Sequence, residues 1–271
     1  MAVGGTELAG APRASWLRRA GGGPAGATAL AVAGGAVSIG LWWLAIIVFH
    51  IESYTAPTPP EVVTAFRQEP AYLFENAKIS LGTTVEGFAI TVLLGVFIGA
   101  VLGSSRTLER AFMPSLVALN AVPKMAFGPL LLVWLGIGRT SSVVMAVLLC
   151  FFPVVLSVAT GLARTPSDLA ELAQSLSASR WQTFAKVRLP GALPQIFVGL
   201  KVGLPLAVIG ALLGELFGAG AGLGFIIVTA GSDTGLSFAA IALVAVMSIV
   251  LYYLLVLVES LLLPWVRETT G

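Results

Sequence analysis

The chain has 271 residues, of which 57% are hydrophobic and only 10% are charged. Soluble domains carry about 25% charged residues, so this composition and a mean hydropathy of +0.97 exclude an ordinary soluble protein and predict an integral membrane protein. A membrane-spanning helix needs about 20 apolar residues, so the length allows five or six spans but no additional enzymatic domain. The net charge of +2 is too small to indicate a nucleic-acid-binding protein.

The first 26 residues are rich in Gly, Ala and Pro and contain three arginines, which predicts a disordered basic tail. The apolar run 27–49 is longer than the about 7–15 apolar residues of a secretory signal peptide, and no small-residue cleavage site follows it. We therefore expect this run to be the first span of a permease domain over residues 27–265. Residues 51–80 are polar, acidic and proline-rich, and predict a short surface helix that leads to span two.

Glycine and proline mark the next two spans. Span two is predicted at 82–102 and packs through small residues, which let helices approach closely in lipid: Gly87, Gly95, Gly99 and, just beyond it, Gly103. Span three is predicted at 112–134 and is interrupted by three prolines: Pro114, Pro123 and Pro129. Each proline removes a backbone donor that hydrocarbon cannot replace, so this backbone must be buried in protein or face water.

Spans four to six are predicted at 143–161, 196–217 and 238–263. Cytoplasmic loops carry an excess of Lys and Arg. With the N-terminus in the cytoplasm, ten of the 15 basic residues fall on the cytoplasmic side and three on the other. Both termini, including the tail 266–271, and the stretch between spans four and five are therefore predicted to be cytoplasmic.

That stretch contains ELAQSLSASRWQTFAKVRLPGALP (171–194), which is unusually polar for this chain. Residues 165–168 favour a helix start, and apolar residues then recur near the helical period as far as Val187. Leu189-Pro190 is expected to end this helix. On physical grounds alone, such an amphipathic helix either lies at the membrane interface or docks on a soluble partner, and both remain open at this point.

The stretch resembles the cytoplasmic EAA loop of binding-protein-dependent ABC importer permeases, whose pattern is Glu-Ala-Ala, then a glycine, then an apolar-x-Leu-Pro ending. Two positions depart from it: Leu172 replaces the first alanine, and Ser177 replaces the glycine, whose backbone turn serine adopts only with strain. The likeness covers about residues 60–265. AVPKMAFGPLLLVWLGIG (121–138), FFPVV (151–155) and GELFGAGAGLGFII (214–227) look like permeases of the nitrate, sulfonate, taurine and pyrimidine-precursor importer group.

The resemblance implies an all-α, type I ABC importer permease fold with about six transmembrane helices in the plasma (inner) membrane. It implies that a loop at 163–194 couples the chain to a pair of ATP-binding subunits through the residues Glu171, Ala173, Ser177, Phe184, Val187, Leu189 and Pro190. ATP and Mg would then be bound by the partner, and this chain would hold no cofactor or metal and catalyse no reaction. In agreement, no glycine is followed by lysine anywhere in the sequence, which excludes a phosphate-binding P-loop. An extracytoplasmic substrate-binding protein and a second permease copy are also implied, most simply as a homodimer.

Several ionisable residues lie in or near the apolar runs, where a charge is costly unless it pairs, snorkels or faces water. Lys124 lies between two prolines, so we predict that it lines the translocation path or pairs with Glu86 or Glu215, which are themselves candidates for the path. Lys201 and Glu259 lie near predicted cytoplasmic span ends, where snorkelling is expected.

Other functions remain open on the sequence. A secondary transporter driven by an ion gradient predicts paired broken helices in two related halves, whereas only span three is visibly broken. A membrane interaction protein without transport would leave the polar helix without a motor. An enzyme is least expected, because the sequence contains one histidine and no metal-ligand cluster. The sequence does not specify the substrate.

Overall fold

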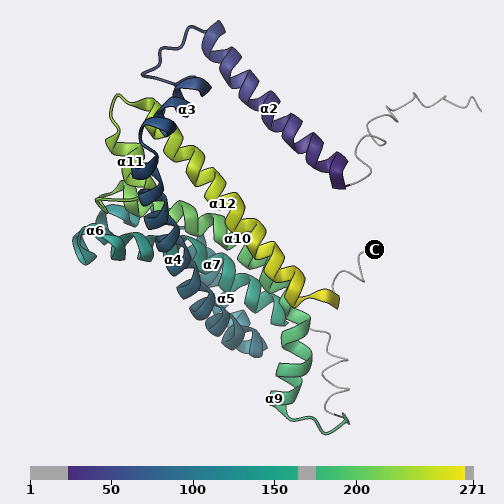
Figure 1. Cartoon of the computed structure of the whole chain (residues 1–271). Helices are drawn as coiled ribbons and strands as arrows, with labels where there is room; N and C mark the ends of the chain where they lie inside the picture. The colour runs from purple at the N-terminus through teal and green to yellow at the C-terminus, as the bar shows by residue number, and fades with distance from the viewer. Residues whose placement is uncertain (1–23, 164–174, 266–271) are drawn as a thin grey trace, which may run out of the picture. The chain divides into compact units, whose positions relative to one another are not determined.

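The computed structural model describes residues 24–163 and 175–265, and every regular element among them is a helix (Figure 1). The chain divides into two compact units, residues 1–60 and 61–271. The first unit contains α2 (Pro24–Val48), an apolar helix that corresponds to the predicted span 27–49. Its described side chains are almost all exposed, and its assignment as a span stays a prediction, as does the single permease domain 27–265.

The second unit contains the helices from α3 to α12. They are α3 (Pro59–Gln68), α4 (Pro70–Ser104), α5 (Arg106–Ala121), α6 (Gly128–Leu135), α7 (Arg139–Ala163), α9 (Arg180–Thr183), α10 (Leu189–Leu216), α11 (Leu223–Thr229) and α12 (Thr234–Leu262). In the described parts of the chain, four helices are long and apolar enough to cross a membrane: α4, α7, the continuous helix Trp181–Leu216 that contains α10, and α12. Four of the predicted spans are thus present as long apolar helices.

The predicted third span is bent. α5 and the segment Lys124–Leu135 count together as a fifth candidate span, but they meet at an angle of 74°. The chain leaves α5 after Ala121, passes Pro123 and the short 3-10 helix η1 (Lys124–Phe127), and enters α6 at Gly128. Of the three prolines only Pro123 lies at the break, because Pro114 is accommodated inside α5 and Pro129 falls in the first turn of α6, where its missing N–H has no partner to lose.

α4 and α7 run parallel and pack through the predicted glycine face. A Cβ at Gly87 would lie 2.6 Å from Cβ of Ala146, and one at Gly99 would lie 2.6 Å from Cβ of Val158, so each glycine admits the facing helix where a larger residue would exclude it. The separation in sequence between the two residues is the same in each pair, which shows that the two helices keep one register along the contact. The predicted packing role of these glycines is confirmed.

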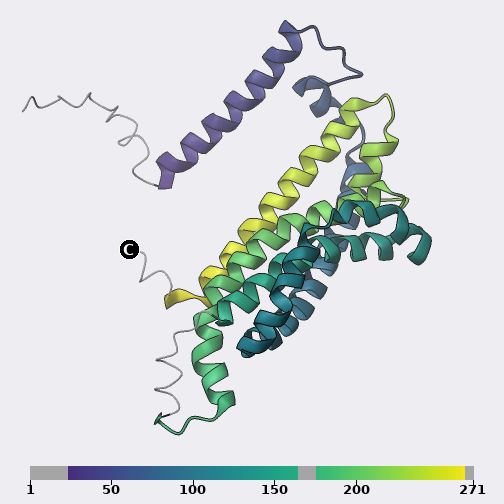
Figure 2. The ribbon, with the colours of Figure 1, turned by 180° about the vertical axis from the view of Figure 1, so that it is seen from behind.

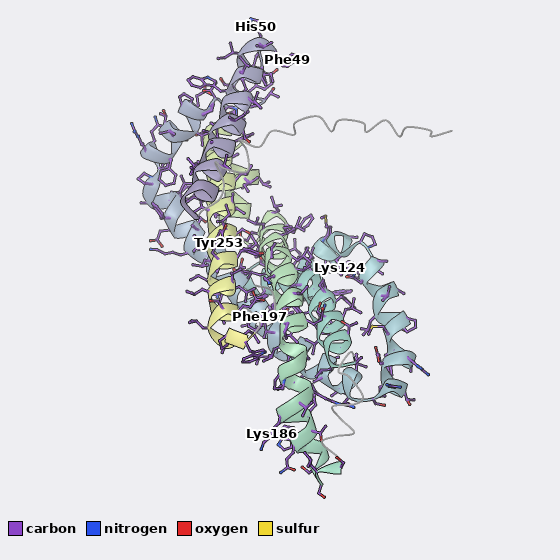
Figure 3. All side chains as sticks on the ribbon, turned by 90° about the vertical axis from the view of Figure 1, so that its right-hand side faces the viewer. Phe49, His50, Lys124, Lys186, Phe197 and Tyr253 are labelled. Carbon is purple, nitrogen blue, oxygen red and sulfur yellow. The ribbon has the colours of Figure 1, made fainter. Side chains whose placement is uncertain are left out.

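α10 packs against α7 in the opposite direction. A Cβ at Gly210 would lie 2.5 Å from Cα of Ala146, and one at Gly203 would lie 2.9 Å from a methyl group of Val154. The apolar core between these helices includes Val158 and Phe197, and Figure 3 shows Phe197 within the bundle. Seen from behind, α5 and α6 lie against α7 (Figure 2). α4, α7 and α10 therefore form the centre of this unit.

The expectation that Leu189-Pro190 ends the polar helix is wrong. Pro190 occupies the first turn of α10, where a proline is tolerated. A five-residue π-helix, η2 (Phe184–Arg188), joins α9 to α10, so one helix of 36 residues runs from Trp181 to Leu216. The polar segment is thus rigidly continuous with the fifth predicted span, which begins well before residue 196.

Candidate functional site: the polar segment and the buried charges

The polar segment, residues 171–194, makes a turn at Ser177. Ser177 has φ +60°, the left-handed conformation that costs an L-residue about 1–2 kcal/mol and that glycine adopts freely. This is the position at which the resemblance placed glycine and a bend. Serine therefore makes the turn here with strain. Glu171 and Ala173, the first two residues of the matching pattern, lie outside the described residues.

A new helix starts two residues after the turn, at a capping box that was not predicted from the sequence. The backbone N–H of Gln182 donates to Oγ of Ser179 at 3.2 Å, and the backbone N–H of Ser179 donates to Oε1 of Gln182 at 2.8 Å. This reciprocal pair satisfies two donors that a helix start otherwise leaves unpaired. The Ser-x-x-Gln spacing at 179–182 was the signal for this second start.

The segment separates into an exposed part and a rooted part. Leu176 and Trp181 are 75% and 73% exposed, and the Trp181 ring stacks on Phe184 with centroids 5.8 Å apart. Phe184 and Leu189 pack instead against the core between α7 and α10. The exposed part therefore presents two large apolar side chains, one in the turn and one at the start of the helix that follows it.

The rooted part accounts for the remaining residues of the matching pattern. Val187 and Pro190 are half-buried like Phe184 and Leu189. Lys186 between them is exposed, and Figure 3 shows it on the stretch of helix that extends beyond the bundle. The predicted coupling residues that the structure describes therefore form the root of the segment and its bend, whereas Leu176 and Trp181, which the pattern does not include, present its apolar surface.

Lys124 does not pair with either carboxylate, so the pairing alternative of the prediction is wrong, and the path alternative stays a prediction. Its Nζ donates to the backbone oxygen of Asn120 at 2.7 Å and to Oδ1 of Asn120 at 3.1 Å, and lies 5.2 Å from the ring centroid of Phe152. Lys124 is labelled in Figure 3. Asn120 is in the last turn of α5, whose carbonyls lose their helical donors at the break. Lys124 thus supplies one of the missing donors and places its Nζ over an aromatic face.

Glu86 pairs with Arg139 instead, with Oε2 of Glu86 2.7 Å from Nη2 of Arg139 and both side chains about half exposed. Lys201 and Glu259 also pair, across α10 and α12, with Nζ 2.9 Å from both carboxylate oxygens. The expectation that these two residues snorkel is wrong, because their side chains are only 25% and 23% exposed and each neutralises the other.

Glu215 is fully buried near the end of α10. Its Oε2 accepts a hydrogen bond from Oγ of Ser80 on α4 at 2.7 Å and another from the backbone N–H of Gly224 at 2.9 Å. Ser80 in turn accepts from the N–H of Leu223 at 2.8 Å. One turn earlier on α4, Oδ1 of Asn76 accepts from the N–H of Gly222 at 2.7 Å. α10, α4 and the start of α11 meet around this carboxyl group.

In sum, this unit combines apolar spanning helices, a broken span with a charge at its break, and a polar segment that extends from one end of a spanning helix. That arrangement is the architecture of a polytopic membrane permease. The part of the chain that the structure describes contains no group of three or more His, Cys, Asp or Glu side chains able to hold a metal ion.

The family model described as binding-protein-dependent transport system inner membrane component matches residues 91–268. The riboflavin transport system permease protein RibX of Chloroflexus aurantiacus is 34% identical over 83% of this chain and 85% of that protein. The taurine transport system permease protein TauC of Escherichia coli is 32% identical over 86% and 88%. The formylaminopyrimidine transport permease protein ThiX of Halalkalibacterium halodurans is 31% identical over 80% and 88%.

Among solved structures, an inward-facing conformation of the MetNI methionine ABC transporter shares the fold. Its TM-score is 0.61 at 22% identity, and the match covers 75% of this chain and 99% of that one. The chain belongs to the binding-protein-dependent transport system inner membrane component family. It is a multi-pass permease subunit of an ABC importer, in which ATP is hydrolysed by a separate subunit. This assignment sets aside the ion-gradient-driven transporter.

Proposed function

We propose that this permease forms the translocation path for a small solute and is driven by a pair of ATP-binding subunits that press on residues 163–194. The observation that carries the proposal is the continuous helix Trp181–Leu216. Its first turns lie on the polar segment and the rest of it is the core of the bundle. Movement imposed on the segment therefore reaches the membrane helices without a flexible joint.

The contact with the ATP-binding subunit is proposed to involve two kinds of residue. Glu171, Ala173 and Ser177 belong to the matching pattern, and Leu176 and Trp181 add the exposed apolar surface. Phe184, Val187, Leu189 and Pro190 act from behind this surface, because they are half-buried at the root of the segment. ATP and Mg are bound by the partner in this scheme.

The solute is proposed to belong to the range that the relatives' names span. These names are taurine, aliphatic sulfonates, nitrate, formylaminopyrimidine and riboflavin. A nitrate-, sulfonate- or taurine-like anion, or a pyrimidine precursor, fits this range. An extracytoplasmic binding protein would deliver the solute, and a second copy of this chain would complete the path. Both termini would lie in the cytoplasm.

Within the path we propose Lys124 first, since it is a cation at a break between two helices. Glu86 is a second candidate, because it and its partner Arg139 are about half exposed. Glu215 stays a candidate from the sequence, although it is fully buried and hydrogen-bonded in this conformation.

The test is purification of the tagged chain from its native membrane in gentle detergent, comparing wild type with Glu171→Ala and Trp181→Ala. We expect an ATPase to co-purify with wild type and to be lost from both variants. Trp134→Ala is the matched control, because Trp134 is exposed but lies on α6, away from the polar segment. An ATPase retained at wild-type yield by both variants would contradict the proposed contact.

A further inference from the structure

The glycine loop that follows α10 is bound to the bundle by side chains whose role the proposed function leaves unexplained. Asn76, Ser80 and Glu215, here called the Glu215 cluster, accept the backbone N–H groups of Gly222, Leu223 and Gly224, respectively, and Ser80 also donates to Glu215. Three consecutive backbone donors at the start of α11 are thus held by α10, which precedes the loop, and by α4, which is far away in the sequence. All three side chains of the cluster are buried.

Two glycines allow the backbone of the loop to approach Glu215 and α10 closely. Gly222 has φ +105°, and a Cβ there would collide with the carboxyl group of Glu215. A Cβ at Gly224 would lie 2.5 Å from the backbone oxygen of Leu212. Only glycine allows backbone N–H groups to reach a buried side chain in this way. The glycines and the cluster therefore form one fitted unit.

The cluster holds the loop by hydrogen bonds and without an ion pair. Three ion pairs occur between the described side chains, and none involves Glu215. Both donors reach Oε2, while Oε1 is buried with no hydrogen-bond partner in the described ranges. An isolated buried negative charge is costly, whereas in the neutral acid Oε2 is the carbonyl oxygen, which accepts the same two hydrogen bonds, and Oε1 carries the proton. The attachment of the loop therefore requires an acceptor oxygen at the position of Oε2 and a side chain of the shape of Glu215.

The Glu215 cluster lies at the end of the long helix opposite to the partner-facing segment. Glu215 lies at the last turn of the helix that starts at Trp181, which at about 1.5 Å per residue spans about 54 Å. The partner-facing segment is at one end of this helix and the Glu215 cluster is at the other. The cluster also reaches α4, so the loop cannot lag behind when α10 and α4 move.

We propose that Glu215 is a positioning residue of the transport cycle, in a neutral, hydrogen-bonding form. With Ser80 and Asn76, it makes the loop 217–222 and α11 follow α10 when the ATP-binding subunits move its opposite end. This proposal rests on the proposed function for the motor and on the hydrogen bonds for the attachment. Without the cluster, ATP hydrolysis continues but α11 no longer moves in step, and transport per ATP falls.

The test compares Glu215→Ala, Ser80→Ala and Glu215→Gln with wild type. The first readout is amide hydrogen exchange of residues 217–226 in the purified chain, which needs no partner. Removing a buried acceptor exposes these amides, so we expect Glu215→Ala to exchange at least about tenfold faster and Ser80→Ala to change in the same direction. Glu215→Gln keeps an acceptor oxygen and the shape, and should stay within about twofold of wild type.

The second readout is solute uptake per ATP hydrolysed in vesicles containing the complete transporter. Glu215→Ala is expected to lower this ratio at least about tenfold with the ATPase rate within about twofold of wild type, and Glu215→Gln is expected to preserve it. Glu75→Gln and Thr229→Ala are the matched controls, because the first removes an exposed carboxylate of α4 and the second a hydroxyl of α11 that bonds only within its own helix.

Unchanged exchange and an unchanged ratio in Glu215→Ala would overturn the proposal. Glu215→Gln behaving like Glu215→Ala would overturn the neutral form and favour a charge in the path. Failure of the motor assignment is recognised separately, because it appears as loss of ATP-driven uptake in wild type while the exchange readout is unaffected. Ser80→Ala removes a single small hydroxyl, so it tests the attachment even if Glu215→Ala does not fold.

Discussion

Arg139 and Glu86 connect the first turn of α7 to α4, with Nη2 and Oε2 2.7 Å apart. Arg139 also lies over Gly82, where a Cβ would come within 3.3 Å of its Nη2. The pair therefore lies toward the end of the bundle that carries the glycine loop, which Ser80 of the same helix holds.

Substitutions in the Glu86–Arg139 pair can distinguish a role in stability from a role in transport. Because both side chains are about half exposed, Glu86→Gln is expected to lower the free energy of unfolding by less than about 1 kcal/mol. If Glu86 belongs to the path, uptake falls while the melting temperature in detergent stays near wild type. The exchanged pair Glu86→Arg with Arg139→Glu should restore stability but not uptake. Uptake unchanged in Glu86→Gln would remove Glu86 from the path.

Lys124→Met tests the broken span. The change keeps the length of the side chain but removes the charge and the hydrogen bonds to Asn120, so we expect uptake to fall about tenfold or more. Lys124→Arg, which retains a cation, should keep most of the activity. Asn120→Ala is the control, because it removes Oδ1 and leaves the backbone acceptor in place. Wild-type uptake by Lys124→Met contradicts a path role for this residue.

Ser177→Gly tests the strained turn. Glycine adopts the left-handed conformation without the cost to serine of about 1–2 kcal/mol, but loses about 0.5–1 kcal/mol through greater freedom in the unfolded chain. We expect Ser177→Gly to bind the ATP-binding subunit at least as tightly as wild type. Ser177→Val should weaken this binding, because a β-branched residue resists positive φ. Equal dissociation constants for Gly and Val would show that the turn does not contribute to the contact.

Gly99→Ala tests the packing of α4 on α7. The added methyl group would lie 2.6 Å from Cβ of Val158, so the helices must separate, at a cost of about 1–3 kcal/mol. Gly191→Ala in α10 is the matched control, since no atom lies within 4 Å of its added Cβ, and an exposed helical Gly→Ala change is neutral or stabilising by up to about 1 kcal/mol. Thermal unfolding of both variants in detergent should separate them clearly, and equal melting temperatures would contradict the close packing.

The sequence predicted those features that depend on local chemistry. The spacing of Gly87 and Gly99 identified a packing face because only small residues allow two helices to touch, and the prolines located the break near Pro123 because proline cannot donate. The turn at Ser177 was expected from the family pattern, although the replacement of its glycine by serine counted against a turn there. Each of these signals is contained within a few neighbouring residues.

The remaining features depend on contacts between distant parts of the chain. Nothing near Leu189-Pro190 distinguishes a helix end from the first turn of a new helix, and here the π-helix before it removes the interruption. The partners of Lys124 and Lys201 were missed, because the choice among several acids and carbonyls depends on how the helices pack. For Glu215, the sequence showed an acid before a glycine loop but not that Ser80, 135 residues away, completes its surroundings.

The interlocking of α7 with both α4 and α10 limits how this permease opens. Gly87 and Gly210 both pack against the same residue, Ala146, so sliding either helix along α7 would drive a larger side chain into a site sized for glycine. The three helices can tilt together but cannot shear past one another. Room for a solute would then be made at the outer surfaces of this trio, where α5, α6 and the proposed second copy of the chain can change their angle to it.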